Sequence, residues 1–268
     1  MTYYKIISTI LLLTFLSIVI LAEEPQPLSI GQLFHYETSY GDQGFKGKNI
    51  NRGKTVPLYK EYENARKVIL PTPSFAGLSV EKAIQKRASV RSFSEKALNL
   101  EQLAQILLST NGITQQRGGI ARRAIPSGGA LYALDVYIIA DNVESLTDGL
   151  YHFQVSDTSL ELIEEGDLSD AICNAANQQR AVGLSPLTVI LTARFDRMTK
   201  KYADRGYRYV YIEAGAACEN IYLQATSLGM GTVAVGAFND DAANKLLGID
   251  GLNEATLLIM PIGFPAKP

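Results

Sequence analysis

The longest regular pattern in this chain runs from about Tyr207 to Leu228 and predicts a single long helix. Small and apolar side chains dominate it, and Gly229 follows directly as a helix stop. A helix with so much apolar surface is unstable when exposed to water on all sides. It must therefore lie in the centre of a core or in a dimer interface, and the other elements must pack around it.

Helix and strand patterns are mixed along the rest of the chain. Helices are predicted for 79–86, 99–112 and 169–182, and strands for 134–140, 186–193, 232–235 and 255–261, with a hairpin over 149–163. These elements do not follow a strict βαβ alternation. The pattern therefore favours an α+β fold, in which helices pack on a sheet.

Composition excludes several classes of protein. The 268 residues are 47% hydrophobic and 19% charged, and the net charge is −2. This balance gives no support for binding to nucleic acid. The two histidines and two cysteines have no ligand-type spacing, so no metal site is predicted. A disulfide between Cys173 and Cys218 stays open, although the chain has no disulfide framework.

The N-terminus has the features of a signal peptide. Lys5 precedes an apolar run from Ile6 to Leu21, and Ala22 stands at a plausible cleavage point. The run is short for a membrane span, but Ile20 is not the preferred residue at the −3 position, so an uncleaved anchor is the alternative. The predicted location is therefore the periplasm or the extracellular space, or the membrane if the segment stays uncleaved. We divide the chain into a signal peptide or anchor (1–22), an irregular N-terminal arm (23–75) and a main domain (76–268).

Three polar residues at 87–91 form a candidate phosphate site. Arg87, Ser89 and Arg91 alternate, so their side chains leave one face of the backbone if the segment is extended. Guanidinium groups carry forked, permanently charged donors that suit a phosphate. The alternative is that Arg87 and Arg91, four residues apart, are surface charges on a helix.

Two glycine-rich segments need separate interpretations. In Pro126-Ser127-Gly128-Gly129, the glycines allow a flat ligand to approach the backbone closely, although a plain turn before a strand is the alternative. The second segment begins at Gly229 and resembles the spacing of a dinucleotide fingerprint. That fingerprint needs a strand before it and a helix after it, and the order predicted here is the reverse.

A polar cluster precedes the long helix and contains Lys201 and Tyr202. Adjacent amine and phenol groups can donate or accept protons during catalysis. The alternative is a solvated loop at the start of a helix. Within the helix, Glu213 is expected to pair with Arg208 or Tyr209.

Taken together, these segments resemble the nitroreductase superfamily of FMN enzymes, and within it the SagB-type, thiazole/oxazole-forming dehydrogenases. The resemblance covers residues 30–266 and rests on the order of several motifs: Arg-x-Ser-x-Arg at 87–91, Pro-Ser-Gly-Gly-Ala-Leu-Tyr at 126–132, Tyr-Ala-Asp-Arg-Gly-Tyr-Arg-Tyr at 202–209, and Gly-Met-Gly-Thr-Val-Ala-Val-Gly-Ala-Phe at 229–238. One departure is Phe264, which stands where many relatives carry arginine.

The resemblance implies a fold, a cofactor and a set of contacts. The fold would be α+β, with a mixed or antiparallel sheet flanked by helices, a long central helix and an intertwined homodimer that binds FMN between its subunits. Lys201 and Tyr202 would be catalytic. The implied FMN contacts are Arg87, Ser89 and Arg91 at the phosphate and ribityl chain, Pro126, Ser127, Gly128 and Gly129 at the isoalloxazine ring, and Val235 and Gly236 at the other edge of the ring.

The expected activity is hydride transfer between FMN N5 and an organic substrate, which is either a small molecule or a peptide whose azoline rings are oxidised to azoles. Two alternatives stay open. One is an NAD(P)H-dependent nitro or quinone reductase, and the other is a flavin- or peptide-binding protein of the cell envelope without turnover. A purely structural envelope protein would leave the arginine, glycine and Lys-Tyr motifs unexplained.

Overall fold

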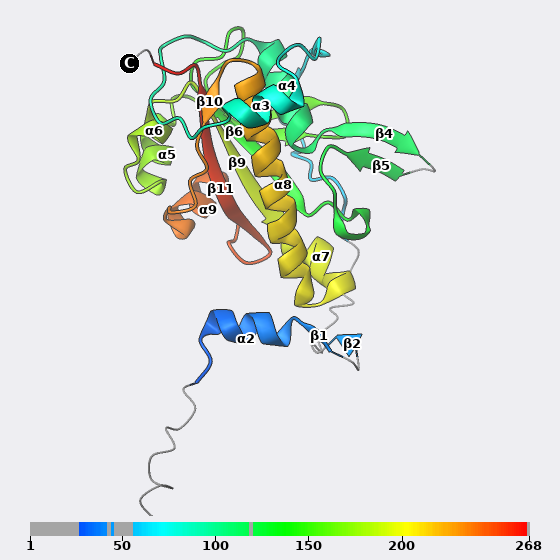
Figure 1. Cartoon of the computed structure of the whole chain (residues 1–268). Helices are drawn as coiled ribbons and strands as arrows, with labels where there is room; N and C mark the ends of the chain where they lie inside the picture. The colour runs from blue at the N-terminus through cyan, green and yellow to red at the C-terminus, as the bar shows by residue number, and fades with distance from the viewer. Residues whose placement is uncertain (1–26, 42–43, 46–55, 118–119, 267–268) are drawn as a thin grey trace, which may run out of the picture. The chain divides into compact units, whose positions relative to one another are not determined.

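The computed structural model describes residues 27–41, 44–45, 56–117 and 120–266, and the chain divides into two compact units, residues 1–47 and 48–268 (Figure 1). The predicted signal segment lies outside the described residues.

In the first unit, helix α2 (Ile30–Glu37) begins with a capping box between Ser29 and Gln32, and β1 (Tyr40–Gly41) pairs with β2 (Gly44–Phe45). The expectation of an irregular arm over 23–75 is therefore wrong for α2, because the capping box supplies a helix start.

The second unit contains a seven-stranded sheet within its described residues, and every pairing in it is antiparallel. Its strand order is β10 (Gly231–Thr232), β11 (Glu254–Gly263), β9 (Leu187–Arg194), β6 (Leu134–Ala140), β7 (Gly149–Gln154), β8 (Ser159–Glu165) and β3 (Lys67–Ile69). Strand β3 comes from the segment expected to be irregular and forms one edge. A separate hairpin joins β4 (Ile113–Arg117) to β5 (Ile120–Arg123).

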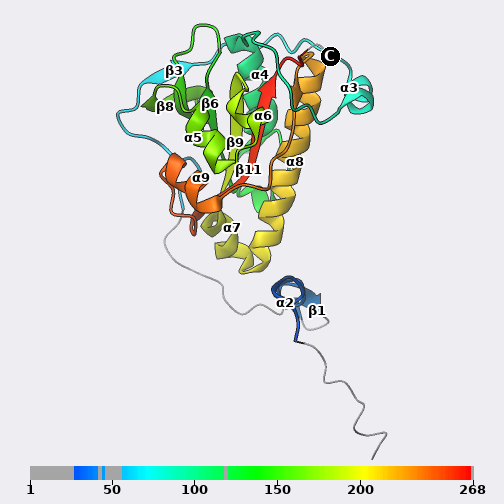
Figure 2. The same cartoon turned by 90° about the vertical axis from the view of Figure 1, so that its left-hand side faces the viewer.

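Helices cover both faces of this sheet. Figures 1 and 2 show α8 (Arg205–Ser227) on one side, and α5 (Ser169–Ala175), α6 (Arg180–Gly183) and α9 (Asp240–Leu247) on the other. Strand β6 contributes to the hydrophobic cluster on each face of the sheet, because successive side chains of a strand point to opposite faces. Ile138 lies in the cluster that includes Val210 of α8, whereas Tyr137 lies in the cluster that includes Ile172 of α5. The structure confirms the α+β class and the central position of the long helix in the core.

Local signals account for several helix ends. Asn99 forms a capping box with Gln102 at the start of α4 (Leu100–Asn111), and Ser79 caps α3 (Val80–Lys86). Helix α8 is followed by Gly229 with a φ of 74°, as predicted for a helix stop. In α3 Ala83 is buried, whereas Val80 and Ile84 are 64% and 58% exposed.

The helix expected over 169–182 is divided. Helix α5 (Ser169–Ala175) ends before Asn177 and Gln178, whose φ angles of 54° and 60° are left-handed, and α6 (Arg180–Gly183) follows. Three further helical elements complete the second unit: η1 (Gly128–Ala130), α7 (Phe195–Tyr202) and α9 (Asp240–Leu247).

The strand expected over 232–235 is shorter than predicted. Only its first residue belongs to β10, and Val235 forms an isolated bridge to Ile259. Both cysteines are free. Among the helices in the described ranges, none is long and apolar enough to cross a membrane.

Candidate active site

The glycine turn lies directly against the Lys-Tyr pair. Gly129 has a φ of 67°, and a Cβ at this position would lie 2.6 Å from Lys201 Nζ and 2.8 Å from Tyr202 Oη. A Cβ at Gly128 would lie 3.6 Å from the Tyr202 ring. The fold therefore brings together two motifs that are more than seventy residues apart in sequence. The close approach requires glycine, because any side chain at position 129 would displace the amine and the hydroxyl.

The backbone around this contact adopts unusual conformations. Ala130, Tyr132 and Ala203 have positive φ angles of 55°, 46° and 49°. Left-handed backbone is unfavourable for residues with a side chain and persists only where the surrounding structure enforces it. Such residues concentrate at functional sites, so their position on both sides of the Gly129–Lys201 contact supports a site here.

Glu213 holds the segment 126–129, which we call the glycine turn. Ser127 Oγ donates a hydrogen bond to one carboxylate oxygen of Glu213, and Ala133 N donates to the other at 3.0 Å. Burial raises the pKa of Glu213 above its usual range, although these hydrogen bonds act in the opposite direction. The expected pairing of Glu213 with Arg208 or Tyr209 is therefore wrong. Instead of bonding to residues of its own helix, the carboxylate accepts hydrogen bonds from Ser127 and Ala133.

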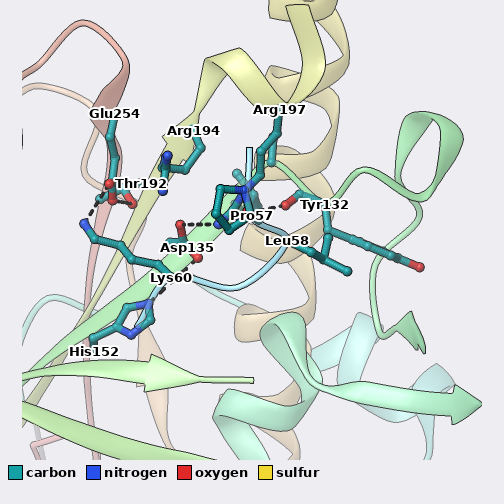
Figure 3. A network of polar contacts seen from close by, with 12 residues as sticks. Pro57, Leu58, Lys60, Tyr132, Asp135, His152, Thr192, Arg194, Arg197 and Glu254 are labelled. Carbon is teal, nitrogen blue, oxygen red and sulfur yellow. Dashed lines mark hydrogen bonds and ion pairs between the residues drawn. The ribbon is translucent and has the colours of Figure 1, made fainter. Parts of the chain in front are cut away.

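Arg197 connects the Lys-Tyr helix to the glycine turn and to the arm. It lies four residues before Lys201 on α7, with its side chain directed toward Pro57 and Asp135 (Figure 3). Nε donates to Pro57 O at 3.0 Å, NH1 donates to Tyr132 O at 3.2 Å, and NH2 forms an ion pair with Asp135 at 3.2 Å. One buried guanidinium thus joins three segments around the candidate site.

The polar network around Arg197 continues across the sheet and holds residues 57–62. Lys60 Nζ contacts Glu254 at 2.7 Å, and the Lys60 carbonyl accepts a hydrogen bond from Gln154 at 2.7 Å. Burial would lower the pKa of Lys60, but Glu254 and Tyr62 together outweigh burial, and the pKa is raised. His152 lies between Asp135 and Glu161 in the same network. Residues 57–62 are therefore fixed by charged partners rather than by apolar packing alone.

The arginine segment lies at the other end of α8. Arg87 lies over the ring of Tyr222, with 5.1 Å from its guanidinium carbon to the ring centre, and Ser89 Oγ lies 3.1 Å from Tyr222 Oη. Ser89 also forms a parallel bridge to Thr232, which confirms the extended backbone expected there. The predicted convergence is incomplete. Arg91 does not share Tyr222 but lines a separate cavity with Arg180 of α6.

Val235 and Gly236 differ in how accessible they are to a ligand. Val235 is 3% exposed and belongs to the core, where its N–H and carbonyl pair with Ile259. Gly236 is exposed, and a Cβ there would meet Leu258 only at 4.0 Å. The peptide groups at 236 are therefore open to a ligand.

Helix α8 sets the distance between the two halves of the predicted site. Glu213 anchors Ser127, and Tyr222 anchors Ser89, nine positions later. At 1.5 Å per residue, this difference corresponds to about 13.5 Å along the helix axis. Sequence reasoning missed Tyr222, Arg197 and Arg180, and it gave Glu213 the wrong partners. No local pattern distinguishes them, because each acquires its role through contacts with segments distant in sequence.

Comparisons with known proteins agree with this architecture. The model of the "Nitroreductase family" matches residues 84–264. A Methanocaldococcus jannaschii protein described as "Putative nitroreductase MJ1384" is 36% identical over 191 residues, which cover 71% of this chain and 93% of that protein. The Escherichia coli "Microcin B17-processing protein McbC" is 24% identical over 90% of this chain and 91% of its own length.

Solved structures give the same result for the fold. A nitroreductase-type structure from Anabaena variabilis superimposes with a TM-score of 0.70 and 27% identity. The match covers 88% of this chain but only 46% of that one, so this chain spans less than half of that protein.

Proposed function

Because the chain belongs to the nitroreductase family of oxidoreductases, we propose that it is an FMN-dependent dehydrogenase that oxidises azoline rings of a peptide to azoles. The observation that carries this proposal is the contact of Lys201 and Tyr202 with Gly129. It places two proton-transfer groups beside a strip of backbone that a planar ligand can approach. The resemblance to McbC, whose name assigns it to the processing of microcin B17, supports a peptide substrate.

The chemistry of the donor set fits FMN. Gly129 is exposed, and the missing side chain makes room for the Lys201 amine and the Tyr202 hydroxyl, so a flat ring can reach the backbone of this turn beside the pair. Arg87 and Ser89 supply a cation and a hydroxyl at the other end of α8, and Arg91 supplies a further cation in the cavity that it lines with Arg180, as a phosphate requires. Bound FMN would supply two-electron redox chemistry at its N5 atom.

The protein's own groups have separate tasks in this proposal. Conversion of an azoline to an azole removes two hydrogens from the substrate, one of them as a proton. Lys201 Nζ or Tyr202 Oη accepts this proton. Glu213 keeps Ser127 and the turn in position, and Arg197 fixes α7 against the turn. These two residues act by positioning, since their polar groups are engaged by the protein.

The assembly and location belong to the same proposal. Tyr211 and Ile212 on α8 are 52% and 64% exposed, and we assign this apolar surface to the contact between two copies. In such a dimer, the FMN-binding residues of one subunit would lie beside residues of its partner. Residues 1–22 would direct export or anchor the chain.

A direct test uses the purified protein loaded with FMN and a model peptide that contains a thiazoline. At least one of the variants Lys201→Ala and Tyr202→Phe is expected to slow reduction of the flavin, followed by its absorbance, by about 100-fold or more, because general acid–base groups contribute on that order. Lys200→Ala, which removes the neighbouring lysine of α7, is the control. Unchanged rates in both variants would contradict the assigned role.

A second candidate is an NAD(P)H-dependent nitro or quinone reductase, favoured by the 36% identity to the M. jannaschii relative. Consumption of NADH with a quinone, together with no oxidation of the peptide, would select it. A protein that acquires no yellow absorbance on incubation with FMN would exclude both enzymes and leave a peptide-binding envelope protein.

A further inference from the structure

A cavity of about 300 Å³ lies beside α6 and combines two cations with apolar walls. Its described lining consists of Arg91, Ser92, Phe93, Arg180 and Leu184. Phe93 is held by a bridge to Pro265, and a Cβ at Gly263 would lie 3.0 Å from the Phe93 ring. The floor of the cavity is therefore well packed, whereas Leu184, at 63% exposure, forms part of its rim.

The charges of this cavity are not balanced by the protein. No acidic side chain belongs to its described lining, and neither Arg91 nor Arg180 forms an ion pair within the described part of the chain. Two guanidinium groups around one space repel each other, and an anion between them converts this repulsion into attraction. Their forked donors match the oxygens of a phosphate or carboxylate.

The position of the cavity connects it to the predicted flavin contacts. Arg91 belongs to the 87–91 segment. On the other side, the connection that leads into α6 bonds to the backbone next to Gly236, because Gln179 Nε2 donates to Ala237 O at 2.9 Å. The chain turns at the left-handed residues Asn177 and Gln178. Arg180, two residues later, therefore lies between the segments 87–91 and 235–236, both of which are assigned to FMN.

Position 264, by contrast, offers no cation. Phe264 packs against the core, and its carbonyl accepts a hydrogen bond from Ser94 N at 2.8 Å. Lys96 Nζ lies 3.8 Å from the centre of the Phe264 ring. Position 264 therefore supplies no guanidinium, whereas Arg180 supplies one to the cavity.

We propose that Arg91 and Arg180 hold the phosphate monoester of the flavin cofactor. The assignment rests on the proposed function, since it takes the phosphate to be that of FMN. It makes Arg180 a determinant of specificity that selects FMN over riboflavin, which has the same ring and ribityl chain but no phosphate.

The experiment measures the affinities of FMN and riboflavin by quenching of flavin fluorescence in the purified, cofactor-free protein. The wild type is expected to prefer FMN. Arg180→Ala is expected to reduce FMN affinity by about tenfold to a hundredfold, as expected for loss of a charge-assisted hydrogen bond, and to leave riboflavin affinity unchanged. Arg180→Lys should retain part of the preference, and inorganic phosphate should compete with FMN in the wild type but weakly in Arg180→Ala.

Three results would overturn the assignment. In the first, Arg180→Ala keeps the full preference for FMN. In the second, Lys96→Ala abolishes the preference while Arg180→Ala does not, which would transfer the role to Lys96. In the third, neither flavin binds to the wild type. That result rejects the proposed function itself, whereas the first two reject only the role of Arg180.

Discussion

Positively charged side chains occupy two regions of this molecule that differ in their partners. On the sheet, Arg197 meets Asp135 at 3.2 Å and Lys60 meets Glu254 at 2.7 Å. In the cavity beside α6, Arg91 and Arg180 have no carboxylate in the described lining. A buried charge must be paired because its desolvation is costly, whereas water stabilises an unpaired charge at the surface. The first region therefore holds the fold together, and the second can receive a ligand.

The pKa values in the sheet network support this distinction. Burial alone would raise the pKa of Asp135, but Arg197 and His152 outweigh it and hold the pKa well below its usual range. The carboxylate is therefore charged at neutral pH and remains a partner for Arg197. Since the guanidinium is always protonated, the pair is kept over the whole physiological range.

The largest expected effect comes from removing one partner of the buried pair. Arg197→Met leaves Asp135 without its principal counter-ion and frees the Pro57 and Tyr132 carbonyls. We expect a loss of about 3–5 kcal/mol in the free energy of unfolding, measured by urea denaturation. The control is Arg66→Met, which breaks a pair with Glu165 in which both side chains are more than half exposed. It should cost less than about 1 kcal/mol. Equal losses of unfolding free energy in the two variants would mean that the buried Arg197–Asp135 pair contributes no more to the fold than an exposed pair does.

The next test introduces a carboxylate into the unpaired region. Leu184→Glu changes an exposed rim residue and offers Arg91 and Arg180 an internal anion. Stability should change by less than about 1 kcal/mol, as for other exposed ion pairs, while FMN affinity should fall by about tenfold or more through competition and repulsion.

Leu184→Gln is the matched neutral control and should keep FMN affinity within about threefold of the wild type, a difference of about 0.6 kcal/mol. Titration of FMN fluorescence measures both variants. If Leu184→Glu binds FMN as tightly as the wild type, the two arginines do not contact an anionic ligand.

The sequence predicted most of the elements that strong local patterns define. The long helix, the strand at 134–140 and the hairpin at 149–163 follow from periodicity and turn residues, and the structure confirms them. The prediction failed at 169–182, where left-handed Asn177 and Gln178 interrupt an otherwise helical pattern. Asparagine tolerates this backbone better than most residues, and here Asn177 Nδ2 donates a hydrogen bond to Ala237 O, a contact that only the folded chain provides.

The sequence motifs of the candidate site could be predicted, but the residues that hold these motifs in position could not. The resemblance to a family singled out Lys201 and Tyr202, and the structure places them together on the glycine turn. The contact of Arg197 with Pro57 joins residues 140 positions apart. No periodicity or spacing encodes such a contact, so only the folded chain reveals it.

The smallest of the expected effects is a pH dependence of stability that is confined to the paired region. Burial would lower the pKa of His152, but its hydrogen bonds and charge interactions with Asp135 and Glu161 raise it above 6.5. Because the folded pKa exceeds the unfolded one, the stabilisation is complete below pH 6.5. It is lost as the pH rises through the folded value.

Urea denaturation between pH 6.5 and 9 should therefore show stability that decreases with pH, with a slope of at most about 1.4 kcal/mol per pH unit for one proton. His152→Gln should flatten this slope. His35→Gln, which changes the other histidine of the chain, is the control and should retain the slope. A wild-type curve that rises over this range would mean that His152 is neutral in the folded protein, and that the sheet network holds the arm without its charge.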